Sequence, residues 1–118
     1  MRIFVGALAI MLLVGCSSVA DIRSTPALLS LHSEKPAKAV AECIRDGWQA
    51  TSIIGGSVGG TLQQSGEKYS VIAPSGESPW HVVDVTPVKT GSAIQYRFYR
   101  TWQSPSDKVT KVVMDCSK

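Results

Sequence analysis

The sequence predicts an α+β domain in which one N-terminal helix packs on a four- or five-stranded antiparallel sheet, with one disulfide. Three observations predict it: an apolar stripe at helical spacing before residue 48, apolar and polar residues that alternate after it, and short turn-rich connections. The 118 residues are 44% hydrophobic and 18% charged, which is ordinary for one folded domain and too apolar for disorder. A net charge of +3 does not indicate a nucleic-acid surface.

The N-terminus has the three parts of a secretory signal. Met1 and Arg2 make a short basic start, residues 3–14 (IFVGALAIMLLV) form an apolar run, and Gly15 and Cys16 end it. This run is shorter than the roughly 20 residues that cross a bilayer as a helix, so we expect no permanent transmembrane helix.

The residues Leu13-Val14-Gly15-Cys16 resemble the lipobox of bacterial lipoproteins. In that family the Cys receives a diacylglycerol and becomes the new N-terminus, so the resemblance implies a signal peptide over residues 1–15 and lipidation at Cys16. By the same analogy, Ser17 implies sorting to the outer membrane, with the domain facing the periplasm. The alternative is a plain secretory signal with a chance Cys near its cleavage site.

The segment after the signal has no clean period. Residues 16–33 carry Pro26 and several serines, so we interpret them as a lipidated N-terminus and tether that leads to an α+β domain over residues 34–118. The alternative is that residues 27–31 (ALLSL) pack on the domain.

The helix is expected to begin at residues 33–36 (SEKP), which combine a capping hydroxyl, an early acid and Pro near the first turn. It should run to about Asp46, and Gly47 should stop it. The apolar stripe that would face the sheet comprises Ala37, Val40, Ala41, Ile44 and Trp48.

Five strands are expected after the helix, near residues 58–64, 68–73, 81–88, 93–102 and 108–116. Short connections imply antiparallel neighbours. On the fourth strand, the alternation turns Ile94, Tyr96 and Phe98 inward. Because the only helix covers one face, the other face should be partly bare.

Two cysteines remain once Cys16 carries lipid. Cys43 lies at the edge of the helix's buried face, and the alternation of the last strand turns Cys116 toward the helix. An even pair in an oxidising compartment predicts a disulfide. Closing so long a loop contributes roughly 4 kcal/mol in the chain-entropy model.

Residues 53–61 (IIGGSVGGT) are unusually rich in glycine. They lack the Lys-Ser/Thr that ends a phosphate-binding P-loop, and no strand is expected before them. We therefore predict a flexible hairpin or a bulged edge strand. The alternative is that residues 54–60 form a mobile loop that inserts into a partner.

No catalytic site, metal site or cofactor is expected. His81 and Asp84 are three residues apart on one strand, so they face opposite sides of the sheet and cannot share a Ser-based triad. We interpret His81 as a surface residue at a strand start and His32 as a tether residue. Two histidines without a pattern of flanking carboxylates do not indicate a metal site.

A candidate partner surface lies on the outward side of the fourth strand. Arg97, Tyr99 and Thr101 point outward there, and Trp80 is expected next to them. Tyr, Trp and Arg are typical of protein interfaces. The alternative is ordinary cross-strand pairing on a solvated face.

Residues 65–69 (SGEKY) resemble the SGxxY motif of the membrane-bound lysozyme inhibitors, which are also small lipoproteins with a disulfide near the C-terminus. The resemblance implies that Ser65, with Lys68 beside it, lies in a loop that enters the lysozyme active-site cleft. It covers these five residues alone, because the family's second motif, YxxxTKG, is absent and the inhibitors are all-β.

These patterns together favour an outer-membrane-anchored, non-catalytic lipoprotein whose periplasmic domain binds an envelope protein as an accessory or structural subunit. The alternative is an inhibitor of a hydrolase such as lysozyme. The domain also resembles small envelope lipoproteins with a helix, a few strands and one disulfide, a likeness that implies no activity. Its expected contacts are the membrane, through lipid, and that protein partner, with no nucleic acid.

Overall fold

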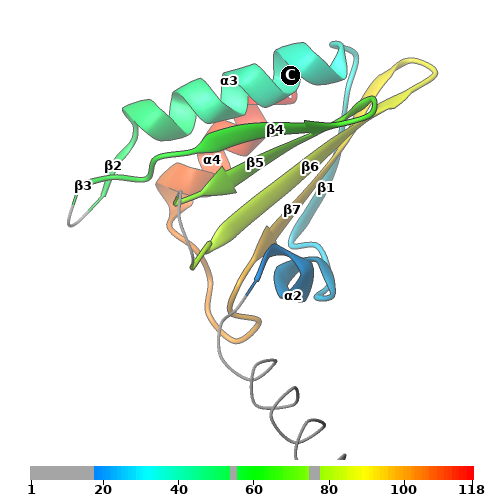
Figure 1. Ribbon diagram of the computed structural model, residues 1–118. Coiled ribbons are helices and arrows are strands. Elements are labelled where there is room, and N and C mark those ends of the chain that lie inside the picture. Colours follow the sequence, from blue (N-terminus) through cyan, green and yellow to red (C-terminus); the bar gives the residue numbers. More distant parts are fainter. Residues whose placement is uncertain (1–17, 54–55, 75–77) are drawn as a thin grey trace, which may run out of the picture.

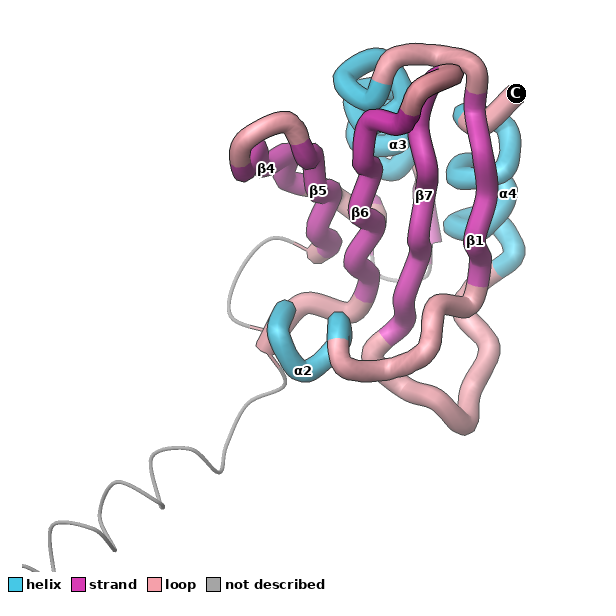
Figure 2. The backbone as a smooth tube through the Cα atoms, turned by 90° about the vertical axis from the view of Figure 1, so that its right-hand side faces the viewer, coloured by secondary structure: helices cyan, strands magenta, loops and turns pink. Residues whose placement is uncertain are grey.

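A computed structural model describes residues 18–53, 56–74 and 78–118. Its centre is a five-stranded antiparallel sheet in the order β1-β7-β6-β5-β4, with α3 and α4 on one face and the short α2 on the other (Figures 1 and 2). The α+β prediction with a helix on an antiparallel sheet is therefore confirmed. The elements are α2 (Val19–Arg23), β1 (Leu29–Ser33), α3 (Ala37–Ala50), β2 (Ser52–Ile53), β3 (Gly56–Ser57), β4 (Thr61–Ser65), β5 (Lys68–Ala73), β6 (His81–Val88), β7 (Gly91–Phe98) and α4 (Asp107–Cys116).

Helix α3 buries the whole predicted stripe, which comprises Ala37, Val40, Ala41, Ile44 and Trp48. It begins later than predicted, because Ser33 ends β1, and it continues past Gly47 to Ala50. Gly47 has a packing role instead of stopping the helix. A Cβ atom on Gly47 would lie 2.5 Å from Cγ1 of Val112, so the missing side chain lets α3 approach α4 closely.

The central strands follow the predicted alternation. Strands β5 and β6 have the predicted bounds, while β4 begins three residues later than predicted and β7 ends four residues earlier. Ile94, Tyr96 and Phe98 of β7 face the helices and are buried, as predicted. Glycines lie in the turns of the hairpins, and Gly91 is the position that tolerates a side chain least. A Cβ atom there would lie only 1.9 Å from the Ser33 carbonyl oxygen.

The predicted last strand, residues 108–116, is wrong, because this segment is the helix α4. Val109, Val113 and Cys116 recur at spacings of four and three and are all buried. Ser106 caps the helix by accepting a hydrogen bond from the Lys108 N–H at 3.3 Å. The β-branched residues suit a strand, but burial at helical spacing against α3 and the sheet decides the conformation.

The tether interpretation does not hold for residues 18–33. Ser18 caps α2 in a capping box with Asp21, and β1 pairs with β7 and becomes an edge strand of the sheet. Leu29 and Leu31 pack against the core, as in the alternative that residues 27–31 join the domain. β1 is therefore the fifth strand of the sheet, in place of the strand predicted at residues 108–116. Residues 16–17 of the predicted tether lie outside the described residues.

The predicted disulfide is confirmed. Cys43 and Cys116 are bonded, with their Cα atoms 5.8 Å apart, and they join α3 to α4 rather than a helix to a strand. A second link between the two helices is the Trp48 indole N–H, which donates to the Val109 carbonyl at 3.1 Å. The two helices are thus held together on one face of the sheet, which leaves the other face to α2.

The glycine-rich segment forms part of a small hairpin. β2 pairs with β3, with Ser52 opposite Ser57, and Val58 then turns into the core with 3% of its surface exposed. This agrees with the predicted hairpin. Residues 54–55, which belong to the predicted insertion loop, lie outside the described residues.

Candidate functional site

A carboxylate lies at the centre of the sheet face that α3 and α4 do not cover. On β6, Val83 and Val85 point to the helices, so Asp84 points to the opposite face. Only 6% of its surface is exposed. Arg23, from the last turn of α2, reaches across and donates from Nε to Oδ2 at 3.0 Å and from Nη2 to Oδ1 at 2.8 Å. The pair fixes α2 on the sheet.

Two further cations lie around this carboxylate. Nη1 of Arg97 is 3.7 Å from Oδ2, and Nζ of Lys68 is 4.0 Å from Oδ1 of Asp84. Among the residues that the structure describes, these three cations have no other carboxylate within 4.0 Å. Within this cluster, one negative charge therefore faces three positive charges, an excess of two.

The surroundings of Asp84 keep it ionised. Burial alone raises the pKa of Asp84. Hydrogen bonds from Arg23 and from the Ser70 hydroxyl, together with the charges of Arg23 and Lys68, lower it by more, so the pKa lies below its ordinary value. The Ser70 hydroxyl donates to Oδ1 at 2.6 Å. Asp84 is therefore a permanent anion at neutral pH that orders the cations around it.

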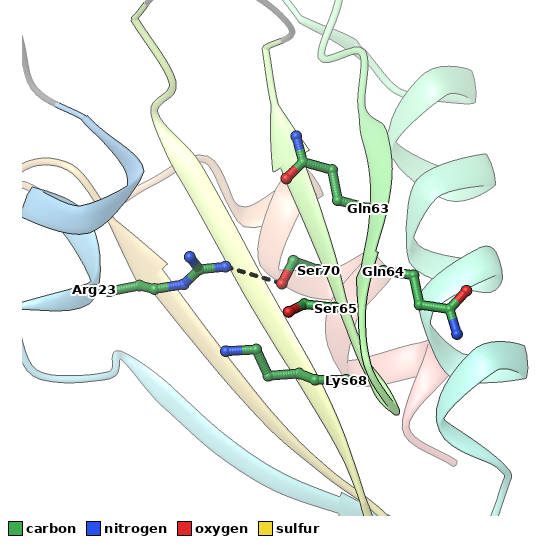
Figure 3. Close-up of a pocket in the computed structure, with 6 residues that line it drawn as sticks. All are labelled: Arg23, Gln63, Gln64, Ser65, Lys68 and Ser70. Carbon is green, nitrogen blue, oxygen red and sulfur yellow. Dashed lines mark hydrogen bonds between the residues drawn. The ribbon is translucent and has the colours of Figure 1, made fainter.

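A polar hollow of about 140 Å³ opens beside this network, between α2 and the β4–β5 hairpin (Figure 3). Figure 3 shows Arg23 and Lys68 reaching toward Ser65 and Ser70, while the Gln64 side chain points away toward α3. The two cations are accessible, with 35% and 39% of their side chains exposed. The residues that line the hollow are Arg23, Gln63, Gln64, Ser65, Lys68 and Ser70.

The arrangement suits an anionic group. Lys68 and Arg23 offer N–H donors and positive charge, and the Ser65 hydroxyl and the Gln63 amide offer neutral donors. Such a set recognises a carboxylate or a phosphate from solution or from a partner's surface. The set combines positive charge with neutral hydrogen-bond donors, so the geometry supports binding of an anion.

The two residues predicted for the inhibitor loop lie together in this hollow. Ser65 ends β4, Lys68 begins β5, and they pair across the turn. Gly66 adopts a positive φ of 61° at the turn, which suits a residue without a side chain. Sequence reasoning missed Arg23, which was placed in the tether. An available signal was Asp84 itself, a single carboxylate in the apolar run HVVDV, which requires a partner when buried.

The predicted partner surface divides into two places. Arg97 has only 15% of its side chain exposed, and its Nε donates to the Thr25 carbonyl at 2.9 Å, so it belongs to the charged network. Trp80 and Tyr99 do meet, as stacked rings with centroids 5.5 Å apart. Thr101 is exposed in the connection beyond β7.

Two residues that sequence reasoning did not single out extend the stacked pair. The guanidinium of Arg100 lies 4.7 Å from the Tyr99 ring centroid and 5.1 Å from that of Trp102. Trp102 has 77% of its surface exposed and Trp80 has 43%. We call Trp80, Tyr99, Arg100 and Trp102 the aromatic rim.

The interpretation of His81 as a surface residue is wrong. It is 4% exposed, it packs on Trp48, and its Nδ1 lies 2.8 Å from the Tyr96 hydroxyl. Burial lowers the pKa of His81 to about 4 and raises that of Tyr96. The expectation that His81 and Asp84 face opposite sides of the sheet is confirmed.

His32 lies in the sheet and not in a tether. It is an exposed residue of β1, and its Nε2 is 2.9 Å from the Thr90 carbonyl oxygen. Within residues 18–53, 56–74 and 78–118, no group of three His, Cys, Asp or Glu side chains is arranged to hold a metal ion. No helix in these ranges is long and apolar enough to cross a membrane.

Comparisons with known proteins return no significant similarity: no family model matches the chain, and no curated protein and no solved structure matches it.

Proposed function

We propose that this chain is a lipid-anchored, non-catalytic protein of the outer membrane whose domain faces the periplasm and binds an acidic envelope protein at the polar hollow. The observation that carries the binding role is the excess of two positive charges where Arg23, Lys68 and Arg97 surround Asp84. The lipobox-like residues 13–16 and Ser17 support the anchor and its location. No enzyme activity and no cofactor form part of the proposal.

Lys68 is the residue best placed to contact the partner. Arg23 already donates two hydrogen bonds to Asp84 and one to Ser70, at 2.9 Å, and most of the Arg97 side chain is buried. Lys68 is 4.0 Å from Asp84, a longer and weaker contact, and its side chain is the most exposed of the three. A carboxylate of a partner protein would therefore meet Lys68 first, with Ser65 and Gln63 beside it.

Capture of partners from gently crosslinked envelopes tests the binding role. Full-length protein with Cys16 intact is compared with Lys68→Glu and with Lys89→Glu, a matched charge reversal at an exposed residue after β6. We expect a reproducible partner in near-equal amount with the unchanged protein and with Lys89→Glu, and its loss with Lys68→Glu. Equal capture by all three forms would contradict the proposed site.

Processing of a Cys16→Ser form tests the anchor. A lipoprotein precursor without the acceptor thiol stays uncut and migrates above the mature protein on a gel. A plain secretory protein would be cut and released in both forms, and that result would contradict the lipid anchor.

A second candidate function is inhibition of a hydrolase such as lysozyme. The observation in its favour is that Ser65 and Lys68 meet at the exposed β4–β5 turn, where a cation can reach a cleft. Glycosidases of this kind use a pair of carboxylates, which Lys68 would complement. A turbidity assay with a muramidase tests it: an inhibitor slows clearing and loses potency with Lys68→Glu, whereas no inhibition at micromolar protein removes this candidate.

A further inference from the structure

The two tryptophans of the aromatic rim are exposed, and Tyr99 and Arg100 between them are half-buried. Trp102 is the most exposed large apolar residue in the described part of the chain, and the Tyr99 ring contacts both Trp80 and Arg100. Arg100 is held in place by Gln103, whose Oε1 accepts from Nη1 at 2.8 Å. The rim is therefore an ordered surface of rings and one guanidinium.

The rim adjoins the start of the described chain. Val19, in the first turn of α2, and Tyr99 pack on the same small cluster of Ile22, Ile72 and Val82. Figure 1 shows α2 and the connection from β7 to α4 at the same end of the molecule, opposite the β6–β7 turn. The residue that caps α2, Ser18, thus lies at the end that carries the rim.

The distance from the proposed anchor to this end is short. Ser18 and Asp21 form a capping box, with Ser18 N–H to Asp21 Oδ2 at 3.0 Å and Asp21 N–H to the Ser18 hydroxyl at 3.2 Å, so Ser18 is fixed to α2. Cys16 precedes Ser18 by two residues, which span at most about 7 Å in any conformation. A lipid on Cys16 would therefore hold this end of the domain at the bilayer surface.

We propose that the aromatic rim lies in the interfacial layer of the phospholipid membrane, with the Trp102 ring at the level of the headgroups. This inference rests on the proposed lipid anchor. Trp and Tyr rings favour this layer because they combine an apolar body with a polar tip, and Arg100 is placed to pair with lipid phosphates. The domain then rests on the membrane through its rim and does not stand away from it on a tether.

The three tryptophans permit a direct test. Trp48 is fully buried, so in a Trp80→Phe form the emission that aqueous iodide can quench comes from Trp102. The lipidated mature form is reconstituted in vesicles of phosphatidylethanolamine and phosphatidylglycerol, and a form that begins at Ser17, without the signal peptide and the acceptor Cys, is measured in solution. We expect iodide to quench Trp102 in solution, and we expect a several-fold loss of that quenching in vesicles together with quenching by brominated lipid.

The matched control moves the reporter to the far end of the molecule. Val88 is 44% exposed and lies seven residues along β6 from His81, about 23 Å away. Val88→Trp in a form with Phe at positions 80 and 102 should be quenched by iodide equally in vesicles and in solution.

Two results would overturn the proposal in distinguishable ways. If mass spectrometry shows acyl chains on Cys16 and the protein floats with the vesicles, but iodide quenches Trp102 as well as in solution, the interfacial placement is wrong and the anchor stands. If the mature protein carries no acyl chains, the anchor and the placement fail together.

Discussion

Arg23 and Asp84 are 61 positions apart in the sequence and form a two-point ion pair, with N–O distances of 3.0 and 2.8 Å. This pair attaches the N-terminal helix α2 to the centre of the sheet. It also fixes one wall of the hollow that Lys68 lines from the other side. The same ion pair therefore stabilises the position of α2 on the sheet and shapes the proposed binding site.

Asp84→Asn should destabilise the domain by about 1–3 kcal/mol, because it leaves partly buried cations without their anion, at a cost reduced by the solvent exposure of Arg23. The pKa of Asp84 is lowered in the folded state, so its contribution is present above about pH 4 and is lost as pH falls further. Urea unfolding at pH 7 and pH 3 should thus show a smaller difference between the two forms at pH 3. Asp115→Asn, at an exposed position of α4, is the control and should have nearly the same free energy of unfolding as the unchanged protein.

The buried His81 should make the domain lose stability in mild acid. Its folded pKa of about 4 lies below the ordinary value of 6.5, so the unfolded state binds the proton more readily between these values. Stability is full above about pH 6.5 and should fall by up to roughly 3 kcal/mol as pH drops toward 4. Urea titrations across this range check it: the free energy of unfolding of His81→Gln should depend less steeply on pH than that of the unchanged protein. An unchanged slope in His81→Gln would contradict the assignment.

Loss of the disulfide should loosen the two-helix layer. Replacing both Cys43 and Cys116 with Ser, in protein that begins at Ser17 throughout, should lower the free energy of unfolding by about 2–4 kcal/mol. Thermal unfolding followed by circular dichroism measures the change. The unchanged pair under reducing conditions should approach the double variant, whereas equal stability of all forms would show that the bridge does not constrain the chain.

Gly91 should tolerate a side chain far less well than Gly66. Both have positive φ, 116° and 61°, but a Cβ at Gly91 would collide with the backbone of Ser33 and Glu34, while nothing lies within 4 Å of one at Gly66. Gly91→Ala should therefore prevent β1 from pairing properly and reduce soluble yield, and Gly66→Ala should cost about 1 kcal/mol. Similar unfolding midpoints for the two variants would contradict this view of the β1–β7 contact.

The sequence predicts an element correctly where its apolar residues fit only one spacing, either that of a helix or that of a strand. The stripe of α3 has only the helical spacing, and β5 and β6 alternate between turns that bound them. Residues 108–116 fit both periods, because Thr110, Val112, Met114 and Cys116 share one face of a strand, whereas Val109, Val113 and Cys116 have helical spacing. Only packing against α3 distinguishes the two, and packing is not visible in a local pattern.

The N-terminal segment and the site also depend on contacts that a local sequence pattern does not show. Helix α2 has five residues, which is too short for a periodic signal, and its stability comes from Ile22 and from Arg23 on the sheet. The strand LSLHS does alternate over its five residues, so β1 could have been predicted. Ser65 and Lys68 were found through a short motif, but their relation to Arg23 depends on a contact between distant segments.

Site-specific photocrosslinking in intact envelopes tests whether a partner protein binds at the polar hollow. A photoreactive phenylalanine analogue replaces Gln63, which lines the hollow, and in a matched form it replaces Lys89, an exposed residue after β6. We expect a discrete protein adduct from position 63 that disappears when Lys68→Glu is added, and no such adduct from position 89. Adducts that are the same from both positions, or that survive Lys68→Glu unchanged, would contradict a partner site at the hollow.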